Sequence, residues 1–552
     1  MSEKDSWQRL MEKRWSRRRL LHTGAVAGGG LWIASALGCG SGSSSSPTAT
    51  PQQAVGTQGP VKPTGKINIA LGTEPLTLDA HKYTAGADSY FTTNVYEGLL
   101  GRDPDGKLVP RLATSYNLST VNGLPVVDFE LRKGVKFHNG DPMTAKDVIW
   151  SVQRQGDPKT GTFFPSYFAA IDHVEAPDDY HVRFYFKKPD AVFLPRGGAV
   201  TVLPKDYFEK VGEKAFGENP VGTGPYKFVE RKVKEYFTLE AHEDYWGGPP
   251  SIKTAVFKII PEEMTRVSML KTGEVDFADN LPPAMVKDIE STKGLKTYAV
   301  SDNNNIFLNI NSLPGSKFAD KRVRQAMAYA IDTKSIIDKV LYGRGVPRVG
   351  ALPGVLGYDP NLKPYPYDPA KAKQLLADAG YPNGFDTVMY GLLPGRVPYS
   401  VEVGEAVAGY LSAVGIRTKV QNLEYAAWIN LGKRGVDPDI DTFAFWMWGD
   451  AQNAEPDPRL MGIAHTFVPE KGYGSYSYHS DPVLDKMIED QENIMDLSQR
   501  EALLKQIFKI WVEDVVALDL YSVIVTFGSK DTIDWKPWAG SPNVILRNMK
   551  FK

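Results

Sequence analysis

Alternating polar and apolar residues and helical spacings succeed one another along most of this 552-residue chain. Residues 66–71 (KINIAL) alternate, which predicts a β-strand. In residues 318–342, apolar side chains from Val323 to Ile331 recur at the three- and four-residue spacings of one helix face. Short strands that alternate with helices predict an α/β protein with mixed sheets flanked by helices.

Capping residues mark several of the predicted helix starts. Thr144 stands three residues before Asp147, which is the spacing of a capping box. Asp368 and Asp481 are each followed by a proline, a residue that suits the first helical position. Gly380 follows the apolar run after Asp368 and predicts the end of that helix. These signals concern packing and carry no chemistry.

The N-terminus has the organisation of an export signal. Arginines at 17–19 precede an uncharged, largely apolar segment, residues 20–38, and Cys39 follows it as the only cysteine of the chain. The paired arginines resemble a twin-arginine signal. Residues 36–39 (ALGC) resemble a lipobox, in which the cysteine is lipidated and becomes the new N-terminus. An uncleaved membrane anchor is the alternative, because residues 20–38 almost reach the length that spans a bilayer.

The remaining chain is predicted to work outside the cytoplasmic membrane. Residues 40–63 are rich in Ser, Gly, Pro and Thr and would form a flexible tether. Removal of residues 1–38, which hold seven basic and three acidic residues, leaves 57 basic against 62 acidic residues. This mildly acidic balance argues against a nucleic-acid partner. With Cys39 lipidated, no thiol remains for a disulfide or a thiolate metal site.

Searches for catalytic motifs find none. The chain contains no H-E-x-x-H, no G-x-S-x-G and no G-x-x-x-x-G-K-[ST]. His465 and His479 lie 14 residues apart among aromatic residues. They could bind a metal ion or, alternatively, be ordinary surface or hydrogen-bonding histidines. We therefore expect a protein that is not an enzyme and that needs no cofactor and no metal.

Eight landmarks in the sequence together resemble the family 5 extracellular solute-binding proteins, the peptide- and nickel-type receptors of ABC importers. They are, in order, Glu74–Asp79 (EPLTLD), Val95–Leu99 (VYEGL), Pro110–Ala113 (PRLA), Phe129–Gly140 (FELRKGVKFHNG), Thr144–Val148 (TAKDV), Gly222–Tyr226 (GTGPY), Tyr245–Pro249 (YWGGP) and Asp320–Ala326 (DKRVRQA). The resemblance runs over essentially the whole mature chain.

The resemblance implies a two-lobed periplasmic-binding-protein-like fold with an extra inserted domain and a hinged cleft that closes over its ligand. The two chain crossings near Asn305 and Tyr521 would form the hinge. The expected divisions are a signal peptide at 1–38, a tether at 39–63, a first lobe at 64–107, 216–304 and 522–552, an inserted subdomain at 108–215 and a second lobe at 305–521.

An aromatic strand that ends in a carboxylate is the best candidate for ligand binding. Residues 443–450 (FAFWMWGD) would present the charge of Asp450 at the rim of an aromatic wall that contains Trp446 and Trp448. In dipeptide- and oligopeptide-binding members of the family, a W-x-G-D segment supplies the aspartate that pairs with the peptide ammonium group. The resemblance transfers this role to Asp450, with Trp448 and Gly449 beside it. Alternatively, Asp450 caps a turn and the tryptophans belong to the core.

A second charge is available in residues 394–399 (PGRVPY). Arg396 could hold the carboxylate of a zwitterionic peptide, because a guanidinium presents a planar fork of donors. Dipeptide-type members of the family carry an arginine in a similar R-P-Y setting, which brings in Tyr399. Tyr476, with neighbouring tyrosines, could contact the peptide or stack on a sugar instead. From the first lobe, Tyr83 and Tyr90 are the candidate contacts.

The predicted function is that of a monomeric receptor, lipid-anchored on the outer face of the cytoplasmic membrane. It would capture di- or oligopeptides in the cleft and deliver them to an ABC permease in the membrane. Two alternatives share the fold: a receptor for cello- or manno-type oligosaccharides and a receptor for a nickel chelate.

Overall fold

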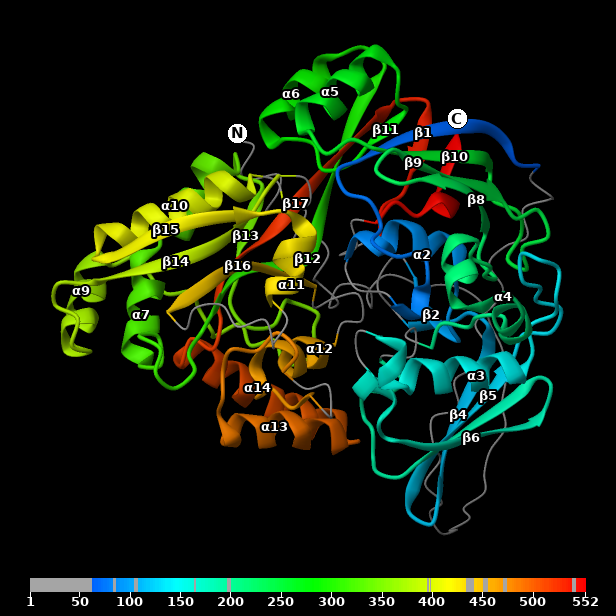
Figure 1. Cartoon of the computed structure of the whole chain (residues 1–552), viewed down its shortest axis with the longest axis horizontal. Coiled ribbons are helices and arrows are strands. Elements are labelled where there is room, and N and C mark those ends of the chain that lie inside the picture. The colour runs from blue at the N-terminus through cyan, green and yellow to red at the C-terminus, as the bar shows by residue number, and fades with distance from the viewer. Residues whose placement is uncertain are drawn as a thin grey trace, which may run out of the picture. The chain divides into compact units, whose positions relative to one another are not determined.

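One mixed sheet joins most of the strands (Figure 1). The computed structural model describes residues 62–82, 86–103, 108–162, 165–195, 200–394, 397, 399–432, 441–449, 455–469, 474–538 and 543–552. All of them belong to Val55–Lys552, one of two units into which the chain divides. Among these residues, the sheet runs in the order β15 (Ile416–Leu423), β14 (Phe385–Leu392), β16 (Thr442–Gly449), β12 (Leu295–Ile310), β17 (Leu518–Lys530), β11 (Phe277–Ala278), β1 (Thr64–Leu71), β10 (Ile252–Ile259), β9 (Tyr236–Ala241) and β8 (Tyr226–Lys232), and β13 (Gly345–Pro347) pairs with β17.

Smaller sheets and helices complete the described part of the chain. A four-stranded antiparallel sheet contains β4 (Ala113–Val121), β5 (Leu124–Leu131), β7 (His181–Phe186) and β6 (Ile171–Asp178); two pairs are β2 (Leu100–Arg102) with β3 (Leu108–Pro110) and β18 (Ile533–Trp535) with β19 (Met549–Phe551). The helices are α2 (Ser89–Val95), α3 (Ala145–Gly156), α4 (Lys205–Glu218), α5 (Glu263–Thr272), α6 (Val286–Ser291), α7 (Lys321–Ala330), α8 (Thr333–Ser335), α9 (Pro369–Asp378), α10 (Ser400–Ala413), α11 (Tyr425–Gly432), α12 (Asp457–Arg459), α13 (Pro482–Asn493) and α14 (Leu497–Glu513). In this described part, no helix combines the length and the apolar character that crossing a membrane requires.

Several predicted elements are confirmed. The alternating run is β1, and the capping box opens α3, where the Thr144 amide donates to Asp147 at 2.9 Å. Asp368 and Asp481 cap α9 and α13 by accepting from backbone amides at their first turns. The continuous helical pattern of 318–342 is interrupted, because α7 ends at Ala330 and Asp332 caps the separate helix α8.

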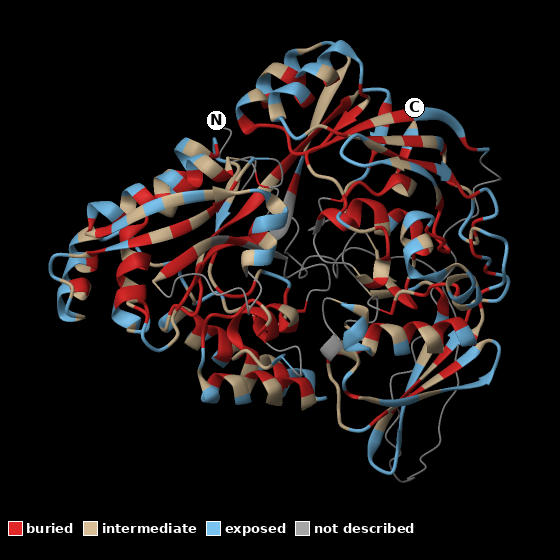
Figure 2. Cartoon of the chain, in the orientation of Figure 1, coloured by how far each residue is buried: buried red, intermediate tan, exposed pale blue. Residues whose placement is uncertain are grey.

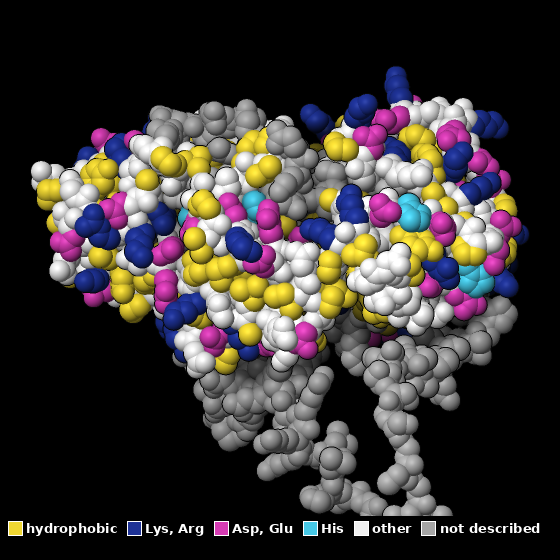
Figure 3. All heavy atoms as spheres, turned by 90° about the horizontal axis from the view of Figure 1, so that it is seen from below, with side chains coloured by type: hydrophobic (Ala, Val, Ile, Leu, Met, Phe, Trp, Pro, Cys, Tyr) yellow, Lys and Arg dark blue, Asp and Glu magenta, His cyan; other side chains and the backbone are white. Residues whose placement is uncertain are grey.

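The sheet buries apolar side chains beneath flanking helices, while most charged residues stay outside. Figure 2 shows the buried class along the strands and on the inward faces of the helices. On the face drawn in Figure 3, Lys and Arg side chains are interspersed with Asp and Glu. This mixture accords with the near balance of 64 basic and 65 acidic residues.

Several sequence landmarks meet in one buried polar cluster around Glu97. Its carboxylate accepts hydrogen bonds from the Tyr245 hydroxyl and the Trp246 indole, both at 2.7 Å, and from the Thr223 hydroxyl at 3.3 Å. Burial raises the pKa of Glu97, and the hydrogen bonds from Tyr245 and Trp246 oppose that shift. The motifs VYEGL, GTGPY and YWGGP, which are far apart in sequence, thus form a single structural joint.

Gly224 belongs to this joint because its backbone lies against the end of α2. Its amide donates to the Val95 carbonyl oxygen at 2.9 Å. A Cβ atom at position 224 would stand 2.6 Å from the Val95 carbonyl carbon and 2.8 Å from the Asn94 oxygen. Backbone atoms on both segments leave no flexible side chain that could move aside.

We expect Gly224→Ala to reduce the free energy of unfolding by about 3 kcal/mol, the upper range for overpacking a rigid site. Gly409→Ala in α10 is the matched control, since no atom outside its own helix lies within 4 Å of the added Cβ. Alanine should be neutral or stabilising there, by up to about 1 kcal/mol. Thermal unfolding followed by circular dichroism measures both, and equal melting temperatures for the two variants would contradict the packing argument.

His138 joins the same region through both ring nitrogens. Its Nδ1 accepts from the Gly222 amide at 3.2 Å, and its Nε2 lies 2.9 Å from the Gly224 carbonyl oxygen. These bonds specify one neutral tautomer. Burial lowers the pKa of His138 from 6.5 to about 3, and the neighbouring His242 ring also disfavours its charge.

Because the folded-state pKa of His138 is depressed, the unfolded chain binds the proton first as the pH falls. The stability contributed by neutral His138 is therefore fully present above about pH 6.5 and is lost progressively toward about pH 3. We expect His138→Gln to lower the melting temperature at about pH 7.5 and to flatten its further fall between about pH 6.5 and pH 4. His173→Gln, a change at a half-exposed ring, is the control. If the melting temperatures of wild type and His138→Gln fell in parallel with pH across this range, the depressed pKa of His138 would be contradicted.

Candidate ligand-binding site

Three parallel strands end at one edge of the sheet. β14 pairs in parallel with both β15 and β16, so the carboxyl ends of these strands, here called the β14 edge, lie together. Residues 393–399 follow β14, and residue 450 follows β16. The segments that contain Arg396 and Asp450 therefore leave the sheet at the same edge, where α/β proteins bind ligands.

A second edge is formed in the same way by the other parallel strands. β1 pairs in parallel with β10 and β11, and their carboxyl ends form the β1 edge. The loops that leave this edge start at residues 72, 260 and 279.

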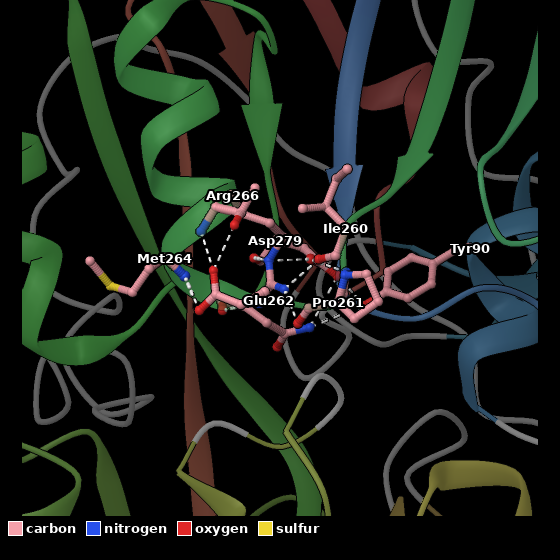
Figure 4. Close-up of polar contacts among 10 residues, drawn as sticks. Tyr90, Ile260, Pro261, Glu262, Met264, Arg266 and Asp279 are labelled. Atoms are coloured by element: carbon pink, nitrogen blue, oxygen red, sulfur yellow. Dashed lines mark hydrogen bonds and ion pairs between the residues drawn. The ribbon is translucent and has the colours of Figure 1, made fainter.

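A buried ion pair ties the loops of the β1 edge together (Figure 4). The side chains of Arg266 and Asp279 are completely buried, with 3.6 Å between Nε and Oδ1. Arg266 also donates to the backbone oxygens of Ile260, Pro261, Asp279 and Asn280 at 2.8–3.1 Å. Asp279 accepts from the Gly72 amide at 2.9 Å and from the Tyr90 hydroxyl at 2.7 Å. All three loops of this edge are thereby fixed by charge-assisted hydrogen bonds.

Two crossing strands connect the edges. β12 pairs with β17 from Leu295–Lys530 to Leu308–Leu518, and the register shifts between Ser301 and Asn305. Within that interval, Asn304 lies opposite Gly449 of β16. At the other end, β17 pairs with β11, and the Leu281 amide donates to the Thr526 carbonyl oxygen at 2.8 Å. Both edges consequently point toward the same stretch of β12 and β17.

Tyr399 lies near groups that follow both edges. It precedes α10 with a left-handed φ of 55°. The backbone of Ala284, beyond the β1 edge, and the carboxylate of Glu263 are close enough to influence the pKa of its hydroxyl. Burial is the main cause that raises the pKa of Tyr399. Nearby, burial raises the pKa of Glu263 at the start of α5, with a further contribution from Glu402 of α10. Groups that follow the two edges are thus close to one another.

Behind the β14 edge lies a stack of aromatic rings. Trp446 is only 1% exposed, and its ring stacks on Trp428 with 4.0 Å between centroids. The Tyr476 ring also packs against Trp446, with 5.6 Å between ring centroids. This stack is a rigid apolar support for the end of β16.

The comparisons with known proteins agree with this architecture. Residues 107–467 match the family model of the bacterial extracellular solute-binding proteins, family 5. The chain belongs to this family. It is 29% identical over 458 residues to the glutathione-binding protein GsiB of Pectobacterium atrosepticum (81% of this chain, 86% of that protein). It is 30% identical over 466 residues to heme-binding protein A of Haemophilus influenzae (79% and 82%).

A solved structure extends the likeness to the fold. The periplasmic binding protein DppA of Helicobacter pylori, in complex with the peptide STSA, superposes with a TM-score of 0.78 at 26% identity, covering 88% of this chain and 98% of that one. The predicted two-lobed fold and the family resemblance are therefore confirmed. Family 5 proteins are receptors that bind small solutes and deliver them to ABC permeases.

The site residues predicted from the sequence of this family 5 protein differ in their surroundings. Trp446 and Tyr476 are buried in the aromatic stack, and Tyr399 lies near groups that follow both edges. Gly449 and the backbone of Trp448 form the end of β16. Asp450, Arg396 and Cys39 lie outside the described residues. Their roles remain predictions.

The two histidines considered as metal ligands, His465 and His479, each lie next to a hydrogen-bonding oxygen. His479 lies 2.9 Å from the Ser312 hydroxyl, and burial lowers its pKa from 6.5 to about 4. The His465 ring lies 2.7 Å from the Thr466 carbonyl oxygen. Within the described residues, no group of three or more His, Cys, Asp or Glu side chains is arranged to hold a metal ion.

Sequence reasoning missed Arg266 and Asp279. β11 has only two residues, so it gives no recognisable alternating pattern before Asp279. Arg266 lies within α5, where an arginine ordinarily indicates an exposed face. Only the pairing of β11 with β1 reveals that Asp279 follows a carboxyl end.

We expect Trp446→Ala to lower the free energy of unfolding by about 3–5 kcal/mol, because it removes a buried ring from the centre of the stack. Tyr367→Ala, at a ring that is 47% exposed, should cost about 1 kcal/mol or less. Thermal unfolding compares the two. Similar losses for both variants would show that the stack contributes no special support.

Proposed function

We propose that this protein captures di- or oligopeptides between the β1 edge and the β14 edge and delivers them to an ABC permease. The observation that carries the proposal is the parallel pairing of β14 with β16. Arg396 and Asp450, one cation and one anion, follow these two neighbouring strands in the sequence. Such a pair matches the two charged ends of a zwitterionic peptide.

Relatives support this choice of ligand class. The Helicobacter pylori protein of similar fold was solved with a peptide. Glutathione, named for the Pectobacterium relative, is itself a small peptide. The Haemophilus relative is named as a heme-binding protein, so ligands vary within this group of relatives. The choice of ligand class for this chain therefore rests on the charges of its own proposed site.

In the proposed complex, Asp450 pairs with the ligand ammonium group and Arg396 with its carboxylate. Trp448, Gly449 and Tyr399 line the site, while Trp446 and Tyr476 support it from behind. Because Trp446 and Tyr476 pack against each other, the aromatic stack offers little free surface for a sugar ring. A neutral oligosaccharide is therefore the less favoured ligand.

We also propose the surrounding organisation that the sequence indicates. A twin-arginine signal directs export, Cys39 is lipidated, and a tether of residues 40–63 holds a monomeric receptor at the outer face of the membrane. The first lobe, the inserted subdomain and the second lobe keep the predicted boundaries, with the hinge in β12 and β17 near Asn305 and Tyr521.

Thermal shift of the unit Val55–Lys552 tests the ligand class. A peptide at about one hundred times its dissociation constant adds about 2.7 kcal/mol of stability. We expect di-, tri- or tetrapeptides to raise the melting temperature, while cello- and manno-oligosaccharides and nickel chelates leave it unchanged. A shift with neutral sugars alone would replace the peptide proposal by the oligosaccharide one.

Asp450→Asn tests the ammonium contact. We expect it to weaken peptide binding by about 2–5 kcal/mol, the usual cost of removing one member of a buried charge pair. Acetylation of the peptide N-terminus should weaken binding to wild type equally and add little in the variant. Asp441→Asn is the matched control, because it removes an ion pair with Lys317 at the opposite end of β16. Undiminished binding by Asp450→Asn would refute the contact.

A further inference from the structure

Every second residue from 455 to 459 attaches the chain to a neighbouring element. Glu455 accepts from both Arg500 terminal nitrogens, at 3.0 and 2.5 Å, and both side chains are 2% exposed. Asp457 accepts from the Gln491 amide at 2.6 Å. Arg459 forms an ion pair with Asp519. The chain after residue 454 is therefore attached in succession to α14, α13 and β17.

Asp519 is the meeting point of these attachments. It is 4% exposed at its side chain, and its Oδ1 accepts from Arg459 and, at 2.5 Å, from the Asn305 amide group. Its Oδ2 accepts from the Gly350 amide at 2.8 Å. Arg459 is completely buried and lies 4.3 Å over the Trp511 ring, which fixes the plane of its guanidinium. Both oxygens of one carboxylate are thus engaged.

Asn305 carries the connection back to the other end of the ligand segment. It lies opposite Trp448 of β16, directly after the register shift in β12, and opposite Ser522 of β17. The end of β16 reaches Asp519 through Asn305, and the chain after residue 454 reaches it through Arg459. Both flanks of the proposed Asp450 segment are consequently held by one carboxylate on a crossing strand.

Such an arrangement specifies position more than it adds stability. A buried ion pair replaces solvation that its charges lose, so well-packed apolar residues often hold a core equally well. A carboxylate that receives three donors from three different segments fixes their relative positions within a narrow range. This geometry suits a point where the ligand segment meets the strands that connect the two edges.

We propose that Asp519 is a positioning residue for ligand binding: it holds the end of β16 and Asp457–Arg459 in place against β12 and β17. The proposal rests on the proposed function in that Asp450, which follows β16, is the residue assigned to the ligand. Asp519 itself does not contact the ligand. Its loss weakens binding because the strand end and the helix that flank the proposed ligand residue are no longer pre-ordered when the ligand arrives.

Asp519→Asn, made in the unit Val55–Lys552, tests this role with the tetrapeptide Ser-Thr-Ser-Ala as the probe. Asp441→Asn is the matched control, because it removes a carboxylate from the same lobe at the far end of β16. Titration calorimetry well below both melting temperatures should show at least tenfold weaker binding for Asp519→Asn and binding within twofold of wild type for Asp441→Asn. Wild-type affinity in Asp519→Asn, with a lowered melting temperature, would reduce Asp519 to a structural role and overturn the proposal.

Amide hydrogen exchange without ligand separates this inference from the proposed function. In Asp519→Asn we expect at least tenfold faster exchange at residues 446–449 and 457–464, with α9 and β15 unchanged. If wild type binds no peptide, the proposed function fails, and the exchange result alone decides whether Asp519 positions the segment. Unchanged exchange in both stretches, or an equal increase throughout the protein, would overturn the positioning role.

Discussion

The pairing of β12 with β17 is the constraint on which the rest of the structure depends. The two strands stay paired from Leu295 with Lys530 to Leu308 with Leu518. At one end they carry β11 and β1, and at the other they carry β16 and β14. Because both groups of parallel strands pair with the same two strands, their carboxyl edges are directed toward each other. The register shift beside Asn305 loosens the ladder at the point where a hinge would need freedom.

Buried charges in this protein lie mainly at joints between segments. Arg266 with Asp279 fixes three loops of the β1 edge, and Arg459 with Asp519 fixes the surroundings of the β14 edge. Each pair is satisfied by further hydrogen bonds, which offset the cost of removing the charges from water. Apolar packing supplies most of the stability, while these ion pairs determine the positions of the loops. A receptor that recognises a ligand's charged ends depends on such placement.

The sequence landmarks divide into two kinds once the structure is known. VYEGL, GTGPY and YWGGP converge on Glu97 and build a joint, so these residues serve the packing of the fold. The strands that precede Arg396 and Asp450 end side by side, at the kind of place where α/β proteins bind ligands. The landmarks that identify the family are therefore distinct from the strand ends that are proposed to carry the ligand site.

The sequence by itself determined the class of fold, the family and the local elements, because alternation, capping and motif order are properties of neighbouring residues. It also singled out charged residues after apolar runs, from chemistry alone. Only the tertiary structure decided that the strands before Arg396 and Asp450 are parallel neighbours, that Tyr399 lies near Ala284, and that Asp279 and Asp519 are buried at the centres of polar networks. These facts depend on strand order and register across hundreds of residues, and no local pattern encodes which distant strands will pair.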